Sequence, residues 1–418
     1  MAGGLSRVKA IIPVGGEAVR LRPLTLENSK ATVRLLNRPL IEHTLVELAR
    51  QGIREIIFGV RGYVNYRSLF DYYKEGIGFS ARYGIKPRVH FKYMPRYDSS
   101  GNADAVRVCL DYYNIKENFF VVQGDNIFSL NLNRVLEYHK KQRAFMTIVL
   151  KEVKNVEEFG VAVLDSKGYI KRFVEKPKRE EAPSNLANTG IYVISSRIRK
   201  LFQSSEFEPM IREGRMDFGK NVIPYLLSSG YRVAGYISRA LWFDVGTPER
   251  YLETMKTLMK KLGAGGLKAI KIDSSSRVYV QGTSVDSRKR RNIIKNLYGK
   301  GELKFDGEVL IGRHASIGKG TKIAYSNIDN FTVIGENVEI EESAVMDRST
   351  IGDCAVIKSS IIGRHVEVRS TRERPTRIEG SVIADDAIIG EGSELVGTKV
   401  APHRTVSTGS VLYNASII

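Results

Sequence analysis

The sequence is poor in cysteine and histidine and has no long apolar run. Its 418 residues include only two cysteines, Cys109 and Cys354, which are far apart and lack any C-x-x-C spacing. This pattern argues against a disulfide framework or a zinc site and favours a reducing compartment. The six histidines are scattered and suggest no Ser-His-Asp or Cys-His arrangement. No apolar run approaches the ~20 residues that a membrane-spanning helix needs, and no signal peptide is recognisable. We therefore expect a cytoplasmic protein with no membrane partner.

The charge balance is strongly basic. The chain carries 65 lysines and arginines against 46 aspartates and glutamates, which gives a formal net charge of +19. Such a charge favours anionic partners, whether nucleotides, sugar phosphates or nucleic acid. The charge is spread along the chain except for one tight cluster, Arg288-Lys289-Arg290-Arg291. We interpret this cluster as the solvated face of a linker helix, and we do not expect nucleic acid as a partner.

Length and pattern divide the chain into domains, because 418 residues exceed one ordinary hydrophobic core. Over residues 1–263, apolar strands alternate with amphipathic helices, which predicts an α/β domain with a mostly parallel sheet covered on both faces. Strands are expected at 8–14, 55–60, 89–94, 119–124, 144–153, 161–165 and 191–195, and helices at 40–51, 103–113 and 251–262. Gly263 would stop the last helix, and a linker at 264–305 would contain the basic helix.

A hexapeptide repeat fills residues 306–418. Aliphatic residues recur at gaps of five or six from Ile311 onward, and glycine often follows them, as in Ile317-Gly318 and Ile334-Gly335. This spacing is typical of a parallel β-helix, whose coils stack their aliphatic side chains on those of neighbouring coils. The segment 369–377, rich in arginine, interrupts the repeat, and we expect it to form an exposed loop.

The first predicted strand runs directly into a loop rich in glycine and arginine. The loop reads Gly15-Gly16-Glu17-Ala18-Val19-Arg20-Leu21-Arg22-Pro23-Leu24-Thr25, and Lys30 follows. Paired glycines let backbone N–H groups approach phosphate oxygens closely. Fixed cations neutralise the charge that moves during phosphoryl or nucleotidyl transfer. The spacing is neither that of a Walker A loop nor that of a dinucleotide-binding fingerprint. The loop therefore predicts a polyphosphate site of another kind.

The loop resembles the signature of the sugar-1-phosphate nucleotidylyltransferases, G-G-x-G-T-R-L-x-P-L-T followed by P-K-P. The resemblance implies that Gly15 and Gly16 bind the nucleotide and that Arg20 and Lys30 are the catalytic cations. It also implies the fold: a Rossmann-like, mostly parallel, three-layer α/β domain followed by a left-handed parallel β-helix. Four substitutions depart from the signature: Ala18 for glycine, Val19 for threonine, and Ser29 and Ala31 for the two prolines around Lys30.

Two aspartates lie in contexts that suit a divalent cation. Asp125 follows the apolar stretch 119–122, at the carboxyl end of a predicted strand, where parallel sheets bind ligands. Asp244 lies in the motif W-F-D-V-G-T-P. Both contexts resemble the family's metal-binding positions, and carboxylate oxygens are the ligands that Mg²⁺ prefers. We expect Mg²⁺ at Asp125 and Asp244, with Asp125 also contacting the nucleotide.

Three further motifs resemble the family's sugar-phosphate pocket. In the V-E-K-P motif, Glu175 is expected to bind sugar hydroxyls and Lys176 the phosphate. Gly160, between Phe159 and Val161, would leave room for the sugar ring. Asn188 begins the N-T-G-I-Y strand that closes the pocket in the resembling enzymes.

The sequence does not identify which nucleobase the protein binds. Gly101 lies in the motif S-G-N-A-D-A-V, which resembles the nucleotide-binding G-T-A-D-A-V beside the base. Arg96 stands where pyrimidine-using members carry glutamine, which disfavours uridine and thymidine nucleotides. The motif at 217–224 resembles adenylyl-transferring relatives, whereas the stretches at 188–192 and 247–251 resemble guanylyl- and thymidylyl-transferring ones.

These motifs predict an enzyme that joins an NTP to glucose 1-phosphate or mannose 1-phosphate, forming an NDP-sugar and pyrophosphate. The reaction would be an Mg²⁺-assisted in-line attack on the α-phosphorus. The β-helix would support assembly into a homo-oligomer.

Two alternatives stay open. The chain could be a non-catalytic regulatory subunit of the same fold, as in the guanine-nucleotide exchange factor of translation initiation, although its retained cations and aspartates argue for catalysis. The β-helix could instead carry an acetyl-coenzyme A-dependent acyltransferase that uses His314 or His365.

Overall fold

The structure is a computed structural model that describes residues 5–98 and 100–418. Two compact units are found, and each contains two stretches of sequence. The first unit contains the chain up to Glu17 and Leu40–Asp244, and the second contains Ala18–Pro39 and Val245–Ile418. The domain boundaries at 263 and 306 stay predictions.

The first unit is built on one mixed sheet with the strand order β10-β9-β11-β6-β1-β4-β5, and β8 joins β11 to β12. The pairs β1–β4, β1–β6, β4–β5 and β8–β12 are parallel, whereas β11 is antiparallel to β6, β8 and β9. The strands are β1 (Lys9–Val14), β4 (Glu55–Arg61), β5 (His90–Arg96), β6 (Phe119–Val122), β8 (Met146–Glu152), β9 (Gly160–Leu164), β10 (Ile170–Glu175), β11 (Leu186–Ile194) and β12 (Val233–Ile237).

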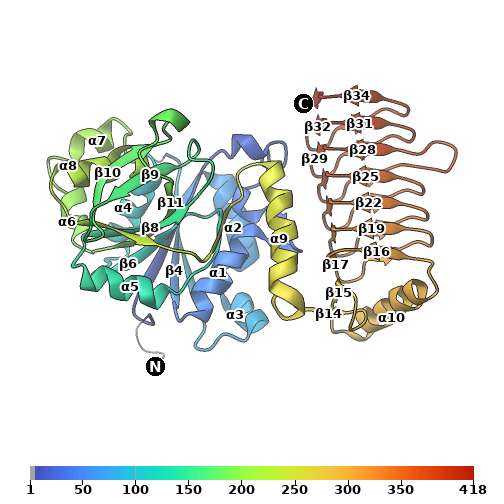
Figure 1. The fold of residues 1–418 in the computed structure, drawn as a ribbon, viewed down its shortest axis with the longest axis horizontal. Helices are drawn as coiled ribbons and strands as arrows, with labels where there is room; N and C mark the ends of the chain where they lie inside the picture. Colours follow the sequence, from blue (N-terminus) through green and yellow to red (C-terminus); the bar gives the residue numbers. More distant parts are fainter. Residues whose placement is uncertain (1–4, 99) are drawn as a thin grey trace. The chain divides into compact units, whose positions relative to one another are not determined.

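Helices cover both faces of this sheet. Successive strand residues point to opposite sides, so neighbouring residues of one strand contact helices on different faces. Ile57 of β4 belongs to the core cluster that contains Val106 of α4 (Asn102–Tyr112). The next residue, Phe58, packs on Tyr93, which contacts α2 (Tyr63–Tyr73). The remaining elements are α1 (Leu40–Arg50), α3 (Ile77–Tyr83), α5 (Leu132–Lys141), α6 (Ile198–Phe202), α7 (Glu208–Arg212), α8 (Ile223–Ser228), β7 (Asn126–Ser129) and β13 (Leu241–Asp244). The expected three-layer α/β domain is confirmed (Figure 1).

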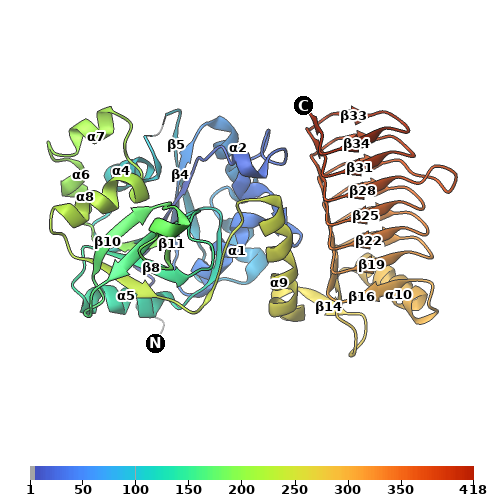
Figure 2. The same ribbon diagram turned by 45° about the horizontal axis from the view of Figure 1, so that its top comes forward.

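The second unit contains a stack of coils formed by three sheets of nine, seven and six strands (Figures 1 and 2). All strands pair in parallel except β14, which is antiparallel to β15. This confirms the expected parallel β-helix. The first sheet contains β14 (Ala269–Lys271), β15 (Val278–Gln281), β17 (Val309–Ile311), β20 (Asn327–Ile328), β23 (Ala344–Val345), β26 (Ile361–Ile362), β29 (Val382–Ile383), β32 (Lys399–Val400) and β35 (Ser416–Ile417).

The other two sheets complete each coil. The seven-stranded sheet contains β16 (Lys304–Asp306), β19 (Lys322–Ala324), β22 (Glu339–Glu341), β25 (Val356–Lys358), β28 (Arg377–Glu379), β31 (Glu394–Val396) and β34 (Val411–Tyr413). The six-stranded sheet contains β18 (Ser316–Ile317), β21 (Val333–Ile334), β24 (Thr350–Ile351), β27 (Glu367–Val368), β30 (Ile388–Ile389) and β33 (Thr405–Val406). The hairpin of β2 (Arg34–Leu35) and β3 (Arg38–Pro39) also belongs to this unit.

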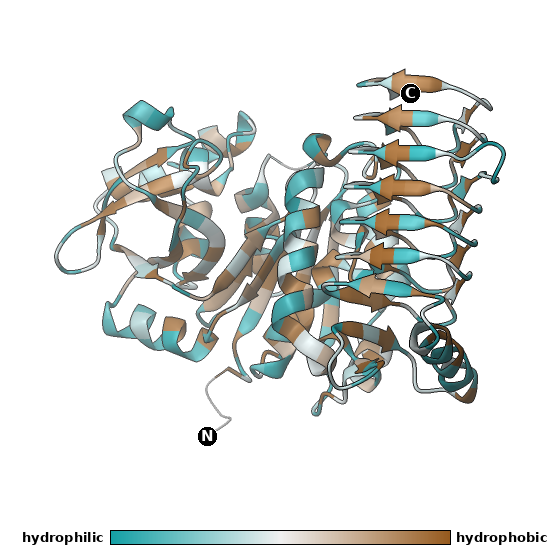
Figure 3. Ribbon diagram, turned by 45° about the vertical axis from the view of Figure 1, so that its right-hand side comes forward, coloured by the Kyte–Doolittle hydropathy of each residue, from teal (hydrophilic) through white to brown (hydrophobic). Residues whose placement is uncertain are grey.

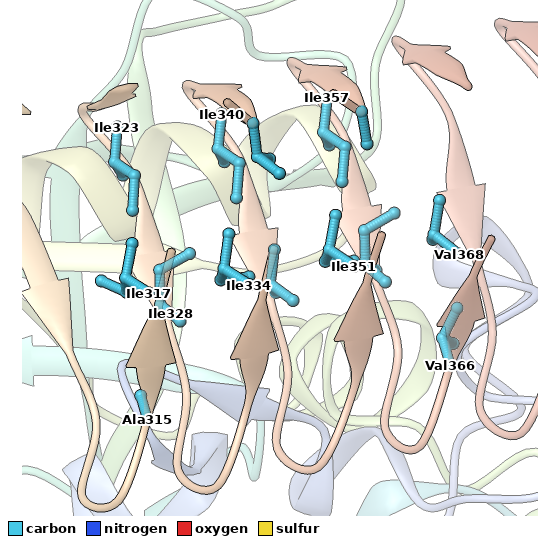
Figure 4. Close-up of a cluster of buried hydrophobic side chains, with 14 of the residues drawn as sticks. Ala315, Ile317, Ile323, Ile328, Ile334, Ile340, Ile351, Ile357, Val366 and Val368 are labelled. Carbon is cyan, nitrogen blue, oxygen red and sulfur yellow. The ribbon is translucent and has the colours of Figure 1, made fainter. Parts of the chain in front are cut away.

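Stacked aliphatic side chains form the core of the β-helix. Ile317 lies beside Ile334 and Ile334 beside Ile351 in one sheet, and Ile340 lies beside Ile357 in another (Figure 4). All of these side chains are at most 7% exposed. Hydrophobic and hydrophilic residues occur together along the same strands (Figure 3), as expected when one side chain points inward and the next outward.

Buried hydroxyl groups form a second continuous contact through the stack. The Oγ of Ser326 accepts the N–H of Ser343, 17 residues later, at 3.0 Å, and the Oγ of Ser343 accepts the N–H of Ser360 at 3.0 Å. Ser381 and Thr398 continue the series. Each serine hydroxyl also donates to a carbonyl of its own coil. The ladder therefore satisfies backbone N–H groups that no strand partner reaches.

The predicted interruption at 369–377 is an excursion between β27 and β28 that is exposed at its tip and buried at Ser370 and Thr376. Before it the hydroxyl ladder advances by 17 residues per coil, and across it by 21. Residues 372–375 are exposed, and the ladder returns to a step of 17 directly afterwards.

The two long helices of the second unit agree with the sequence analysis, and a second helical stretch follows the break at Gly263. α9 (Pro248–Leu267) has non-helical dihedral angles at Gly263 (φ 56°, ψ −168°), but helical turns resume and continue past the predicted stop. Lys256 of α9 pairs with Glu342 of the β-helix at 2.9 Å. α10 (Val285–Gly299) contains the basic cluster, which is largely exposed, as predicted. Across 5–98 and 100–418, no helix is both long and apolar enough to cross a membrane.

The hydroxyl ladder yields a stability prediction. Ser343→Ala leaves the buried N–H of Ser360 without an acceptor, so we expect it to lower the free energy of unfolding by about 1–3 kcal/mol. Ser410→Ala removes a hydroxyl near the end of the stack that donates to Ser407 O at 2.7 Å, and it should cost less than about 0.5 kcal/mol. Chemical denaturation measures both; equal effects would contradict a role for the ladder.

A buried histidine predicts the acid stability of the first unit. His139 is 2% exposed, and its Nδ1 lies 2.9 Å from Thr147 Oγ1. Burial, followed by Arg197 and Lys140, lowers its pKa from 6.5 to about 4. The unfolded chain therefore binds more protons between these two values, and stability should fall as the pH drops through this window.

We expect the loss from His139 to approach about 3 kcal/mol at most, at about 1.4 kcal/mol per pKa unit. Denaturation of His139→Gln between pH 7 and pH 4 should show a shallower decline than the wild type. The exposed His90→Gln is the control. A wild-type decline unchanged by His139→Gln would contradict this assignment.

Candidate active site

The glycine-rich loop begins where β1 ends. Gly15 lies against Arg61 of β4 so closely that a Cβ on it would lie 2.5 Å from the Arg61 Cβ. Ala18 has a left-handed backbone (φ 47°, ψ 41°), the conformation that suits the glycine of the signature. Its carbonyl accepts the N–H of Leu21 at 2.9 Å and the hydroxyl of Thr25 at 3.0 Å. The substitution at this position therefore keeps a glycine-like backbone.

Arg20 and Lys30 both lie on the segment 18–39 and belong to the second unit. Arg20 is exposed within the short helix η1 (Val19–Leu21), and Lys30 begins the next one, η2 (Lys30–Thr32). The turn at Lys30 is fixed because Ser29 O accepts both the N–H and the hydroxyl of Thr32, each at 2.9 Å.

Asp125 and Asp244 are brought together in the first unit by a short antiparallel pair. Asp125 immediately precedes β7, and Asp244 is the last residue of β13, opposite Asn126. Opposed residues of antiparallel strands have Cα atoms about 4.5–5.5 Å apart, so the two aspartates lie in adjacent positions. Both side chains are half-buried. Over 5–98 and 100–418, no group of three or more His, Cys, Asp and Glu side chains is arranged to hold a metal.

Buried hydrogen bonds fix the strand that follows Asp125. The Asn126 amide donates to Thr189 O at 2.6 Å, and the Thr44 hydroxyl donates to Asn126 O. The indole of Trp242 donates to the same Thr189 carbonyl at 3.1 Å. Trp242 of β13 and Asn126 of β7 are therefore both held to the Thr189 carbonyl of β11, and Asn126 is a residue to which the sequence analysis gave no role.

Gly160 and Glu175 face one another across the β9–β10 pair. A Cβ on Gly160 would lie 2.3 Å from Phe173 Cζ and 2.6 Å from Glu175 Oε2. Lys176 follows with φ 48°, and its N–H donates to Phe159 O at 3.1 Å. Only a glycine at position 160 leaves the Glu175 carboxylate in its observed place.

The Glu175 carboxylate also lies beside the motif at 217–224, to which the sequence assigned no definite role. A Cβ on Gly219, in the π-helical turn η4 (Phe218–Val222), would lie 2.4 Å from Glu175 Oε2. Burial and then Asp217 raise the pKa of Glu175, whereas Lys176 and Lys220 oppose that shift. The motif at 217–224 therefore lies beside the predicted sugar-phosphate pocket.

Asn188 lies on β11 and is held by its own strand. Its amide donates to the Tyr192 hydroxyl at 2.9 Å, and its Oδ1 accepts the N–H of Gly190 at 2.9 Å. Burial raises the pKa of Tyr192, and the nearby Asp217 and Glu175 raise it further, whereas Asn188 opposes the shift. Asn188 is thus near the group around Glu175.

Gly101 lies against the backbone of Met216, and Arg96 is paired with a buried aspartate. Gly101 has φ 134°, and a Cβ there would lie 2.3 Å from Met216 O. The Arg96 guanidinium donates to Asp104 Oδ2 at 2.8 Å, and Asp104 is 1% exposed. The residue that replaces the glutamine of pyrimidine-using members therefore pairs with a buried carboxylate beside the Gly101 motif.

The predicted site residues thus fall into two sets. The first unit contains the glycines of the loop, both aspartates and all of the predicted sugar-phosphate residues, and the second contains Arg20 and Lys30. The sequence analysis missed Arg34, Asp329 and Asp347, which form a buried ion-pair group in the second unit. One signal was available: Asp329 stands at a repeat position that other coils fill with small or apolar residues, Gly312, Met346, Gly363, Ala384 and Ala401.

A cavity of about 540 Å³ lies elsewhere in the first unit and contains none of the predicted site residues. It is near the starts of β8 and β12, whereas Asn188 pairs with Leu150 further along β8. Its lining is Arg143, Phe145, Arg197, Lys200, Leu201, Ser204, Glu206, Gly230, Tyr231 and Arg232.

Comparison with known proteins covers almost the whole chain. Residues 9–261 match the nucleotidyl transferase family, and residues 305–418 match the GMPPB C-terminal domain. A mannose-1-phosphate guanyltransferase of Pichia angusta is 30% identical over 96% of this chain and 97% of its own length. A glucose-1-phosphate adenylyltransferase of Desulfitobacterium hafniense (strain Y51) is 27% identical over 92% and 95%.

Solved structures support the same assignment. A candidate glucose-1-phosphate thymidylyltransferase from Bacillus anthracis aligns with a TM-score of 0.52 and 25% identity, over 62% of this chain and 98% of its own. From its fold, its motifs and these matches, the chain belongs to the nucleotidyl transferase family, among the sugar-1-phosphate nucleotidylyltransferases.

Proposed function

We propose that this enzyme transfers a nucleotidyl group from an NTP to a hexose 1-phosphate. A phosphate oxygen of the sugar phosphate attacks the α-phosphorus in line, the bond from that phosphorus to the bridging oxygen breaks, and pyrophosphate leaves. Such a transfer depends on positioning and on neutralising charge rather than on a protein nucleophile. The observation that carries the proposal is the adjacency of Asp125 and Asp244 beyond the end of β6.

The donor set fits Mg²⁺. Two carboxylates on neighbouring strands supply hard oxygen ligands, and Mg²⁺ in proteins usually takes one or two carboxylates and completes its shell with phosphates and water. When bound, Mg²⁺ would neutralise phosphate charge at the reacting triphosphate. Asp125 and Asp244, at the paired ends of two strands, would hold this cation.

The cations of the loop act on the phosphates. Arg20 neutralises the pyrophosphate that leaves, and Lys30 binds the α-phosphoryl oxygens. Gly15 and Gly16 let backbone N–H groups approach the triphosphate, and Gly101 binds nucleotide beside the base. The left-handed backbone at Ala18 supports a functional loop rather than a degenerate one.

The sugar phosphate binds in the pocket formed by Gly160, Glu175, Lys176 and Asn188. Glu175 accepts hydrogen bonds from the sugar hydroxyls, and Lys176 pairs with the phosphate. The pair to test first is GTP with mannose 1-phosphate, because the matched C-terminal domain and the 30% identical relative both favour it. Glucose 1-phosphate with ATP is the second pair. The β-helix supports assembly of the enzyme into a homo-oligomer.

Pyrophosphate release tests the reaction. The full chain with Mg²⁺ should release pyrophosphate with one pair from a panel of nucleoside triphosphates and hexose 1-phosphates, and chelation by EDTA should stop it. Asp125→Asn and Arg20→Ala should each lower kcat by at least about 100-fold, because each removes charge that stabilises the transition state. Asp71→Asn and Arg67→Ala, an exposed pair on α2, should stay within about twofold.

Two results would contradict the reaction. Absence of turnover with every pair, together with retained nucleotide binding, would favour a regulatory subunit. Incorporation of labelled acetyl groups from acetyl-coenzyme A would favour an acyltransferase.

The sugar pocket yields a second prediction. Gly160→Ala places a methyl group where Glu175 Oε2 and Phe173 Cζ now lie, so Glu175 must move. We expect the KM for the sugar phosphate to rise at least about tenfold, with the KM for the nucleotide within about twofold. Gly78→Ala, where a Cβ meets nothing within 4 Å, is the matched control. A parallel rise in both KM values would argue against a sugar-specific role.

A further inference from the structure

A buried arginine fixes the segment 18–39 to the β-helix. Arg34 is 9% exposed, and its guanidinium meets Asp329 and Asp347, which are 0% and 5% exposed. Arg34 Nη2 donates to Asp329 Oδ1 at 2.9 Å, and Nε donates to Asp329 Oδ2 and lies 3.2 Å from Asp347 Oδ1. Asp329 follows β20 and Asp347 follows β23, so the arginine joins two successive coils. We call these three residues the Arg34 anchor.

The surrounding contacts hold the anchor in place. The Asp329 carboxylate also accepts the N–H and the side-chain amide of Asn330, at 2.6 and 2.8 Å. The Tyr251 hydroxyl of α9 donates to Arg34 O. Asp347 is shared with Arg364, whose Nε donates to Asp347 Oδ1 at 2.8 Å. The anchor is therefore a hydrogen-bonded group of opposite charges rather than a surface ion pair.

Other residues of the segment contact the β-helix as well. Asn28 Nδ2 donates to Asp385 Oδ2 at 3.1 Å, and Glu27 lies 3.0 Å from His403 Nε2. On the other side of Arg34, Asn37 Nδ2 donates to Gln281 Oε1 at 3.1 Å. These contacts run from β15 to the turn after β32, so the segment follows the stack over many coils.

The charges of the anchor depend on one another. Burial acts to raise the pKa of Asp347, but Arg34, Arg364 and Arg348 outweigh it and hold that pKa below its ordinary value. Burial raises the pKa of Asp329 despite the opposing effect of Arg34. Loss of Arg34 alone would leave two buried carboxylates without their shared cation, which destabilises a fold more than removal of the whole group.

Lys30 is linked to the Arg34 anchor through a short stretch of backbone. It lies four residues before Arg34, and the hydrogen-bonded turn η2 occupies most of the interval. A displacement of Arg34 therefore moves the backbone of Lys30. We propose that Arg34, through Asp329 and Asp347, is a positioning residue that fixes the loop carrying Arg20 and Lys30 for nucleotidyl transfer. This role rests on the proposed function, since it matters only if those cations act on the triphosphate.

The test separates positioning from stability by removing all three charges of the anchor together. Arg34→Met/Asp329→Asn/Asp347→Asn removes one cation and both carboxylates, so no buried charge is left unpaired within the anchor. We expect it to fold, with a thermal midpoint close to that of the wild type, and to lose at least about tenfold in kcat, because a displacement of about 1 Å in a catalytic group costs that much or more. The KM for the sugar phosphate should stay within about twofold, because the proposed pocket lies in the other unit.

Two further variants complete the experiment. Arg348→Met removes a half-exposed cation that pairs with the same Asp347 from the β-helix, and its kcat should stay within about twofold. Arg34→Lys keeps the charge but loses the bidentate contact with Asp329. Its kcat should fall between those of the wild type and the triple variant. Hydrogen exchange of the peptide that covers 28–36 should speed up at least about tenfold in the triple variant and not in Arg348→Met.

The outcomes distinguish the two proposals. A folded triple variant with wild-type kcat would overturn the positioning role and leave the proposed function intact. Unchanged exchange at 28–36 would overturn the anchor itself. Absence of turnover in the wild type would overturn the proposed function and, with it, the role of Arg34 in catalysis, whereas faster exchange in the triple variant would still establish the physical anchor.

Discussion

A coil of the β-helix cannot bury its aliphatic side chains without a coil beside it, and the second unit is organised by this requirement. The isoleucines of successive coils stack, and the hydroxyl ladder from Ser326 to Thr398 supplies acceptors to N–H groups between the sheets. The result is a continuous support along which a loop can be held at many points. The segment 18–39 uses it in this way, with Arg34 at the most buried contact.

The family match and the compact units do not coincide. Residues 9–261 match the nucleotidyl transferase family, yet 18–39 and α9 belong to the unit that contains the β-helix. Asp125 and Asp244 lie at strand ends in the first unit, whereas Arg20 and Lys30 belong to the second. In this division, the family match and the contacts of Arg34 with the β-helix overlap at the segment 18–39.

Local patterns predicted much of the fold. The apolar strands, the helix that contains Val106, and the hexad spacing each reflect which side chains face a core, so they are readable over a few residues. The pairing of β7 with β13 was not readable, because it joins residues more than a hundred positions apart. Arg34 was missed for the same reason. Nothing around it in sequence distinguishes it from a solvated arginine, and its partners are about 300 residues away.

Departures from the signature have different physical meanings in the structure. Ala18 keeps the left-handed backbone of the glycine that it replaces, so that change alters the side chain and not the path of the chain. Arg96, in place of a glutamine, is engaged with the buried Asp104. A motif match scores both as mismatches, and only the surroundings separate them.

The four extra residues between β27 and β28 have a practical consequence. The stack resumes its step of 17 residues immediately after them, so the coil junction absorbs additional length without shifting any strand. A fluorophore-bearing peptide or affinity epitope could therefore be spliced in at 372–375, giving a reporter on the β-helix that leaves the coil order undisturbed.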